Sequence, residues 1–290
     1  MSKRINTAVL PVAGLGTRFL PMTKSAPKEM LPIVDRPVIH YVVEEALSAG
    51  ITHFVLVTSG SKRAIEDYFD TNFELEHRLL EQGKTELLTT VRNLIPQHVS
   101  FSYIRQPEPL GLGHAIACAE PVVGNQPFAV LLADDIIDTG TQSGCLSQLI
   151  AHYETTASSV LAIEEVPLED THRYGIVSFH ENSTRIHHIV EKPRPEQTPS
   201  RWAVTGRYVL TPSIFRHLAK QERGASGEIQ LTDAIAQLLQ EEPVSAIPFQ
   251  GCRFDCGSKE GFLQATLHYA MRDEHLRAKL RPYLLEALAL

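Results

Sequence analysis

VAGLGTRFLPMTKSAPKEMLP, residues 12–32, follows a short apolar run and contains two closely spaced glycines, Gly14 and Gly16. Two cations come after them, Arg18 and Lys28. The backbone amides of glycines that follow a first strand can approach phosphate groups closely. Arginine and lysine beside such a loop can neutralise phosphate oxygens, including those that gain charge in a transition state. The stretch therefore favours a triphosphate-binding loop at the carboxyl end of the first strand.

Two better-known nucleotide-binding motifs do not match this loop. A dinucleotide-binding fold needs G-x-G-x-x-G opening a helix at once, but the third glycine is absent and Pro21 interrupts the helix. The second strand, HFVLVTSG (53–60), ends without an acidic residue for a ribose, so a dehydrogenase is disfavoured. The P-loop pattern G-x-x-x-x-G-K-[ST] is also absent. The remaining alternative is a tight turn beside surface cations, since Arg and Lys are mostly exposed in proteins.

Composition limits the classes of protein that the chain can belong to. The 290 residues are 43% hydrophobic and 21% charged, which is ordinary for a globular protein that folds as one large α/β domain. The net charge of −7, from 27 basic and 34 acidic residues, argues against a nucleic-acid partner. No apolar run approaches the roughly 20 residues of a membrane span, and no signal peptide is recognisable. Because the four cysteines are scattered, we expect a cytoplasmic protein with reduced thiols.

Strand-like and helix-like segments alternate over the first 160 residues, as in a parallel sheet covered on both faces. The predicted strands are Thr7–Ala13, His53–Ser59, Val99–Arg105, Phe128–Ala133 and Val160–Ile163. The predicted helices are Pro37–Ala49, Ser61–Gln82, Gly113–Ala119 and Ser143–Thr155.

The pattern changes after about residue 160. Three strand-like segments follow one another closely, Gly175–Phe179, Arg185–Val190 and Ala203–Leu210, and antiparallel additions to the sheet would explain them. Helical segments follow, at Pro212–Lys220, Glu228–Gln240 and Lys259–Ala287. No shift in composition separates the two parts, so we expect one domain over residues 1–290.

The motifs of this chain resemble those of a known family. The run A-G-x-G-T-R-x-x-P-x-T with the later P-K-E-M-L-P resembles the sugar-1-phosphate nucleotidyltransferases, and most of all their bacterial UTP–glucose-1-phosphate uridylyltransferase members. Seven further blocks resemble that family, in its order and over nearly the whole chain: RQPEPLGLGHA (105–115), LLADD (131–135), RYGIV (173–177), VEKP (190–193), TGRYVL (205–210), GEIQLTDAI (227–235) and FDCGSKEGF (254–262).

The resemblance implies a Rossmann-like α/β fold of the glycosyltransferase-A type, with helices on both faces of a mixed, mostly parallel sheet. Residues 1–160 would mainly bind the nucleotide, and residues 161–290 would mainly bind the sugar and supply the C-terminal helices. The implied reaction converts UTP and α-D-glucose 1-phosphate into UDP-glucose and pyrophosphate with Mg²⁺. A homo-oligomer, dimer or tetramer, is also implied.

For the nucleotide, the resemblance assigns the first loop to the phosphates and Lys28 to transition-state charge. Arg18 joins this phosphate-binding set, and Gln106 and Gly111 are assigned to the uracil, with the backbone near Ala13 and Gly14. A carboxamide can pair with the edge of uracil, although an exposed glutamine is the more common situation. Uracil and thymine present the same pairing edge, so dTTP or CTP in place of UTP stays open. The implied nucleotide-binding loop residues are Ala13, Gly14, Gly16 and Thr17.

A metal site is predicted where the apolar run 129–133 ends in Asp134. Strand ends at the carboxyl edge of a sheet are the usual ligand side, and carboxylates suit Mg²⁺. A helix cap is the alternative role for Asp134. The resemblance supplies Asp255 as the second ligand.

The sugar phosphate needs a cation, and the resemblance assigns Lys192 to it as a catalytic residue. Hydroxyl groups of the sugar need convergent donors and acceptors. Glu191 and Glu228, with the backbone at Gly175 and Gly206, are the candidates. Glu228 could instead be a first-turn charge of the following helix, and Gly206 a strand bulge. A homologue without catalytic activity is disfavoured, because the charged residues of the predicted site are all present: Arg18, Lys28, Asp134, Lys192 and Asp255.

Overall fold

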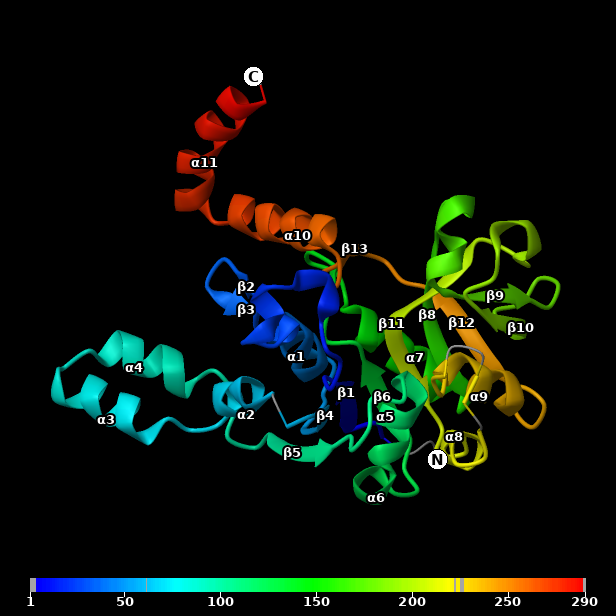
Figure 1. Cartoon of the computed structure of the whole chain (residues 1–290). Helices are drawn as coiled ribbons and strands as arrows, with labels where there is room; N and C mark the ends of the chain where they lie inside the picture. The colour runs from blue at the N-terminus through cyan, green and yellow to red at the C-terminus, as the bar shows by residue number, and fades with distance from the viewer. Residues whose placement is uncertain (1–3, 61, 222, 225–226, 289–290) are drawn as a thin grey trace.

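A nine-stranded mixed sheet forms the centre of the molecule in the computed structural model (Figure 1), which describes residues 4–60, 62–221, 223–224 and 227–288. Its order is β10-β9-β11-β6-β1-β4-β5. Strand β8 also pairs with β11, and β12 pairs with β8. The parallel core consists of β1 (Thr7–Pro11), β4 (His53–Thr58), β5 (Ser100–Arg105) and β6 (Phe128–Leu131). Strands β1, β4 and β6 are mostly buried apolar runs, as parallel strands covered on both faces are, whereas the edge strand β5 is only partly buried.

Strand β11 (Trp202–Leu210) extends the core in the opposite direction, because it pairs antiparallel with β6. It also pairs with β8 (Ser159–Glu165) and β9 (Gly175–Phe179). Strands β10 (Ile186–Glu191) and β12 (Val244–Pro248) complete the sheet. The α/β class and the antiparallel additions expected from the sequence are therefore confirmed.

Alternate strand residues pack against helices on the two faces of the sheet. On one face, Val9 and Val130 pack with α5 (Leu112–Cys118), α8 (Ile214–Leu218) and α9 (Leu231–Leu238). On the other face, Leu10 and Leu131 pack with α1 (Val38–Ser48), α2 (Arg63–Phe69) and α7 (Cys145–Thr156). This alternation is the two-residue period of a strand. Helix α6 (Glu120–Val123) follows α5.

A small antiparallel ladder lies outside the main sheet and joins distant parts of the chain. It pairs β7 (Asp135–Asp138) with β13 (Cys252–Asp255), and its register sets Asp255 opposite Asp135. Helix α10 (Lys259–Arg272) follows directly after β13. A second short ladder, β2 (Pro32–Ile33) with β3 (Arg36–Pro37), precedes α1. Neither β12 nor the short strands were predicted from the sequence.

Two predicted helices are each divided in the structure. The helix expected over Ser61–Gln82 is α2 followed by α3 (Phe73–Glu81), and Ser61 lies outside the described residues. Asn72 caps α3, its Oδ1 accepting from Leu75 N at 3.0 Å, as asparagine does at helix starts. Asp273 likewise caps α11 (Glu274–Ala287) and divides the helix expected over Lys259–Ala287. The sequence also missed α4 (Thr85–Arg92).

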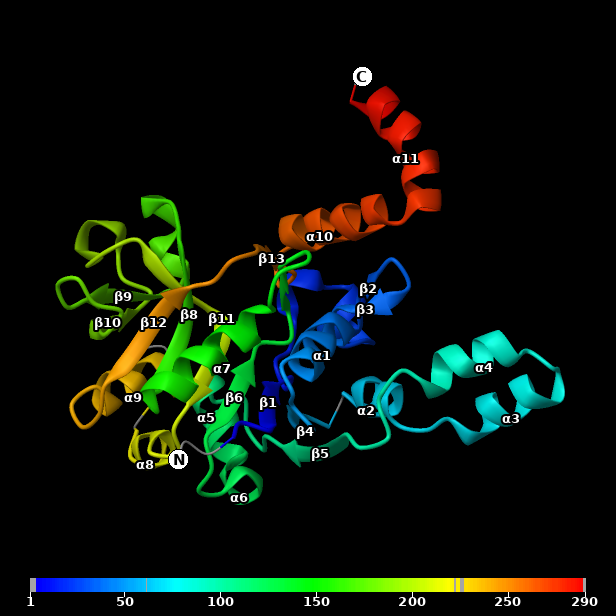
Figure 2. The ribbon, with the colours of Figure 1, turned by 180° about the vertical axis from the view of Figure 1, so that it is seen from behind.

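Two segments project from the body, the α3–α4 arm and α11 (Figures 1 and 2). No described residue of α11 is buried, and Tyr283 and Leu285 are more than 60% exposed, at 66% and 63%. Within the described ranges, none of the helices is both long and apolar enough to span a bilayer. The thiols of all four cysteines are free, and Cys252 is exposed.

Candidate active site

An open cavity of about 680 Å³ lies at the carboxyl ends of the core strands. The structure brings every site residue predicted from the sequence to its lining. They are Ala13, Gly14, Gly16, Thr17, Arg18, Lys28, Gln106, Gly111, Asp134, Gly175, Glu191, Lys192, Gly206, Glu228 and Asp255. The cavity therefore collects residues from the first loop, the β5–α5 loop, the end of β6 and the C-terminal half of the chain.

The glycine loop leaves β1 and turns sharply at the cavity. A Cβ built at Gly14 would meet nothing within 4 Å, so the backbone there is open to a ligand. Gly16 has a φ of +66°, a left-handed conformation that glycine adopts without strain. Thr23 Oγ1 donates to Gly16 O at 2.8 Å and fixes the turn. A short 3₁₀ turn over Thr17–Phe19 follows, so the long helix of a dinucleotide-binding fold does not begin here.

The carboxylates of Asp134 and Asp255 and the guanidinium of Arg18 surround Gly257. A Cβ at Gly257 would lie 2.7 Å from Asp134 Oδ2 and 3.0 Å from Asp255 Oδ1, and 3.5 Å from Arg18 Nη1. Only a glycine lets both carboxylates approach this point. Asp134 precedes strand β7, not a helix, so the alternative of a helix cap is wrong.

The donor chemistry of this point suits a hard cation that takes only part of its ligands from the protein. Asp134 and Asp255 present oxygens to the same place. Among the residues that the structure describes, no group of three or more His, Cys, Asp or Glu could hold a metal ion unaided. Mg²⁺ characteristically uses one or two carboxylates and completes its shell with phosphate oxygens and water. The pair therefore fits a magnesium site that forms together with a phosphate substrate.

Each of these carboxylates has a cation beside it. Lys28 Nζ donates to Asp134 Oδ2 at 2.5 Å, and Arg173 Nη2 donates to Asp255 Oδ2 at 3.2 Å. Burial raises the pKa of Asp134, but the Lys28 ammonium outweighs burial, so the pKa lies below its usual value. Burial lowers the pKa of Lys28, and the carboxylates of Asp134 and Glu29 raise it overall. Both groups are therefore charged at neutral pH.

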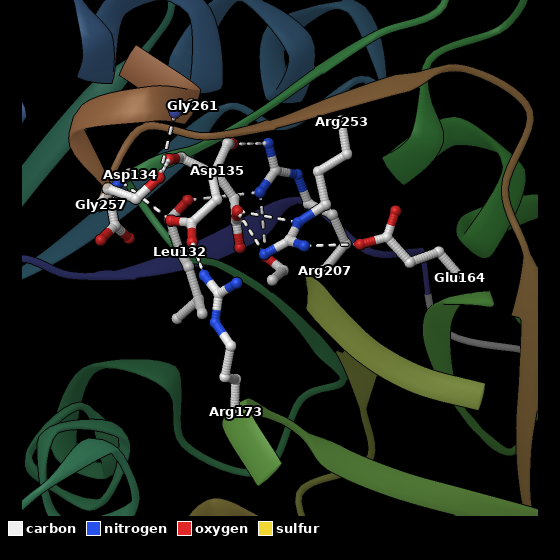
Figure 3. A network of polar contacts seen from close by, with 12 residues as sticks. Leu132, Asp134, Asp135, Glu164, Arg173, Arg207, Arg253, Gly257 and Gly261 are labelled. Carbon is white, nitrogen blue, oxygen red and sulfur yellow. Dashed lines mark hydrogen bonds and ion pairs between the residues drawn. The ribbon is translucent and has the colours of Figure 1, made fainter. Parts of the chain in front are cut away.

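A fully buried arginine holds the turn that carries Asp134. Arg207 donates through Nη2 and Nε to Glu45 Oε2 at 2.8 and 3.0 Å. It also donates to Asp135 O at 2.7 Å and to Gly206 O at 3.0 Å (Figure 3). Burial lowers the pKa of Arg207, but the carboxylate of Glu45 raises it overall. The pair thus ties α1 and β11 to the turn that carries Asp134.

The carboxylate of Asp135 forms an ion pair with a second arginine, Arg253. Its Oδ1 accepts from Arg253 Nε at 2.9 Å, while Arg253 Nη1 donates to Glu164 at 2.6 Å. Burial raises the pKa of Asp135 to about 6, against the lowering effect of Arg253. A Cβ at Gly206 would lie 2.6 Å from Asp135 Oδ2. Gly206 also lies within the register shift of β11 against β8. The glycine is therefore part of a strand bulge and also lets the Asp135 carboxylate approach the backbone closely.

The predicted sugar-phosphate residues lie across the cavity. Lys192 has a φ of +45°, rare for a residue with a side chain, and its Nζ lies 3.2 Å from Glu191 Oε1. Thr232 Oγ1 donates to Glu191 Oε2 at 2.7 Å. Glu228 precedes α9, which begins only at Leu231, so the alternative of a first-turn charge is wrong. Backbone strain at a cavity is typical of functional positions.

Several cavity residues were missed in the sequence. Arg173 and Tyr174 belong to the block RYGIV, in which only Gly175 was assigned, and Tyr208 belongs to TGRYVL. Their places in blocks that resemble the family were the available signal. Glu45, which holds Arg207 from outside this cavity, carried no signal, because it follows the equally charged Glu44, which is exposed.

Comparison with known proteins gives consistent matches over almost the whole chain. The model of the nucleotidyl transferase family matches residues 7–272. The UTP–glucose-1-phosphate uridylyltransferase of Bacillus subtilis is 51% identical over 288 residues, which cover 97% of each chain. A structure of UDP-glucose pyrophosphorylase from Acinetobacter baumannii has a TM-score of 0.91 at 46% identity, over 98% of this chain and 99% of that one. A UTP-bound structure from the same organism has a TM-score of 0.90 at 46% identity, over 97% and 99%.

Proposed function

Because this chain belongs to the nucleotidyl transferase family, we propose that it is a UTP–glucose-1-phosphate uridylyltransferase. It transfers the uridylyl group of UTP to α-D-glucose 1-phosphate and yields UDP-glucose and pyrophosphate. The observation that carries this proposal is the convergence of Arg18, Lys28 and two carboxylates on one point of the cavity. The names of the relatives, which are about half identical, point to the same substrates.

The reaction brings two anions together, so positioning and positive charge are its main requirements. The loop at Gly14, Gly16 and Thr17 holds the triphosphate through backbone amides, and the backbone near Ala13 and Gly14 lies at the uracil. Arg18 and Lys28 stabilise the charge that develops as pyrophosphate leaves. The phosphate oxygen of the sugar attacks the α-phosphorus in line. It is already ionised at neutral pH, so the protein needs no general base.

Asp134 and Asp255 would hold Mg²⁺. When bound, the ion neutralises charge on the triphosphate and helps to orient it. The residues of the chain complete the arrangement, because Lys28 donates to Asp134 Oδ2 and Arg18 Nη1 donates to Gly257 O at 3.4 Å.

On the acceptor side, Lys192 neutralises the sugar phosphate. Glu191, Glu228 and the backbone at Gly175 and Gly206 bind the sugar hydroxyls. A Cβ built at Gly175 would lie 3.0 Å from Thr232 Oγ1, which supports tight packing on the proposed sugar side of the cavity. Gln106 and Gly111 bind the base.

The chain acts as one catalytic unit in the cytoplasm, with residues 1–160 mainly binding nucleotide and residues 161–290 mainly binding sugar. Free thiols support a reducing compartment. We also propose a homo-oligomer, dimer or tetramer, because the described part of α11 leaves Tyr283 and Leu285 uncovered. Light scattering during gel filtration tests this, and a monomeric mass would refute it.

The function is tested by measuring pyrophosphate release for UTP, dTTP and CTP, each with glucose 1-phosphate and galactose 1-phosphate. We expect UTP with glucose 1-phosphate to give the highest kcat/KM. A preference for dTTP or CTP would change the nucleotide assignment and leave the reaction type intact. No release with any pair would support a silent binding homologue.

A further inference from the structure

The side-chain amide of Gln106 has two acceptors already in place. Its Nε2 lies 3.2 Å from Gly111 O and 3.0 Å from Nδ1 of His114. An amide nitrogen carries two hydrogens, so these two contacts use both of them. The described residues give Oε1 of Gln106 no donor, and the side chain lines the cavity.

The first acceptor, Gly111 O, belongs to a rigid segment. Ile229 N donates to Leu110 O at 2.7 Å, and Gly113 N donates to Ile229 O at 2.9 Å. Gly111 has a φ of +98°, and a Cβ there would lie 2.8 Å from the Cβ of Glu228. The backbone on both sides of Gly111 is therefore held against the segment before α9, and its carbonyl cannot turn away freely.

The second acceptor depends on the tautomer of His114. If Nε2 carries the proton, it can donate to Cys118 Sγ, 3.9 Å away, and Nδ1 accepts from Gln106. If Nδ1 carries the proton, it can donate to Glu108 O at 3.2 Å. Gln106 would then have to turn its oxygen toward His114 and toward Gly111 O. The first arrangement leaves Nδ1 facing Glu108 O, 3.2 Å away, and the second leaves the Gln106 oxygen facing Gly111 O. Only the first keeps both hydrogen bonds of the Gln106 amide, so we take it as the favoured one.

We propose that His114 determines nucleobase specificity by fixing the Gln106 amide with its oxygen directed at the base. The inference rests on the proposed function, in which Gln106 faces the base. An amide fixed in this way accepts and does not donate, so it selects a base with an N–H at ring position 3. Uracil and thymine have this N–H, whereas cytosine has a lone pair there. His114 is thus a positioning residue that acts through Gln106 and excludes CTP.

The arrangement rejects CTP strongly, because the Gln106 oxygen would face the lone pair of cytosine at ring position 3.

The test compares His114→Leu, which removes the acceptor, with His114→Asn, whose Oδ1 can replace Nδ1. The readout is the ratio of kcat/KM for UTP to that for CTP, by pyrophosphate release. His77→Leu, at an exposed position on α3, is the control.

We expect His114→Leu to lower the UTP:CTP ratio at least tenfold, mainly through a higher KM for UTP, and His114→Asn to restore most of it. Should the leucine variant fold poorly by circular dichroism, His114→Gln tests the same point, because its polar group lies nearer the position of Nε2.

An unchanged ratio in a folded His114→Leu or His114→Gln variant overturns the inference. Equal loss in the leucine and asparagine variants also overturns it, because packing alone would then explain the effect. These results leave the proposed function standing if the wild-type protein uses UTP. Wild-type protein without activity on UTP refutes the proposed function itself.

Discussion

Lys28 Nζ lies 2.5 Å from Asp134 Oδ2, so the first loop and the end of β6 share one charged pair inside the cavity. The two side chains are only about one-fifth exposed, at 22% and 23%. The ion pair gives each charge a partner in this partly buried place. It also places the ammonium beside the oxygens that would hold the metal. A phosphate bound at Gly257 would therefore meet positive charge from both the ion and the lysine.

Lys28→Ala should fold and lose turnover by roughly 100-fold or more, because it removes positive charge aimed at the reacting phosphate. The measurement is kcat by pyrophosphate release, with circular dichroism to confirm folding. Lys24→Ala is the matched control, since Lys24 lies on the same loop and is exposed. Similar kcat values for both variants would contradict the role of Lys28.

Asp134→Asn and Asp255→Asn should each weaken metal binding, because an amide carries no charge and is a poorer ligand for a hard cation. We expect activity to fall at least 100-fold, with poor recovery at high Mg²⁺. Mn²⁺ binding in the presence of UTP, followed by electron paramagnetic resonance, gives an independent readout. Asp67→Asn, on the exposed side of α2, is the control. Near-normal behaviour of both site variants would remove the metal assignment.

Arg207→Met should lower the free energy of unfolding by about 3–5 kcal/mol, because it leaves the buried Glu45 without its partner. Arg216→Met breaks a pair of similar length, 2.9 Å, but with side chains 63% and 47% exposed, and should cost under about 1 kcal/mol. Urea denaturation measures both. Adding Glu45→Gln to Arg207→Met should recover part of the loss. Equal losses of unfolding free energy in the two variants would show that Arg207 does not stabilise the interior through Glu45.

Asp138 should make stability depend on acid pH. Burial raises its pKa, but Gly140 N–H, His268 and Arg272 outweigh burial and hold the pKa below its usual value. A carboxyl group whose pKa is lower in the folded state stabilises it above the unfolded pKa, about 3.9. That contribution disappears as pH falls through the folded pKa. The difference in unfolding free energy between wild type and Asp138→Asn should therefore be largest near pH 7 and shrink below about pH 4. A difference that is constant with pH would contradict this origin.

Features with a local signature could be predicted from the sequence. The glycine loop and Asp134 sit where apolar strands end, and a parallel sheet brings such ends to one edge. The divisions of the long helices were also readable in principle, since Asn72 and Asp273 are typical caps.

Features that depend on distant pairing could not be predicted without the resemblance. Strands β7 and β13 have four residues each, too few to show a period. Arg207 and Glu45 are charged residues that look like surface positions in their own segments, and only the fold brings them together in the interior. The resemblance identified Asp255, which no local pattern indicated.

The ladder that sets Asp255 opposite Asp135 joins parts of the chain that leave the ribosome far apart in time. The glycine loop and Asp134 emerge first, and Asp255 follows 121 residues after Asp134. A nascent chain therefore lacks one side of the proposed metal site until Asp255 has emerged and the ladder can pair.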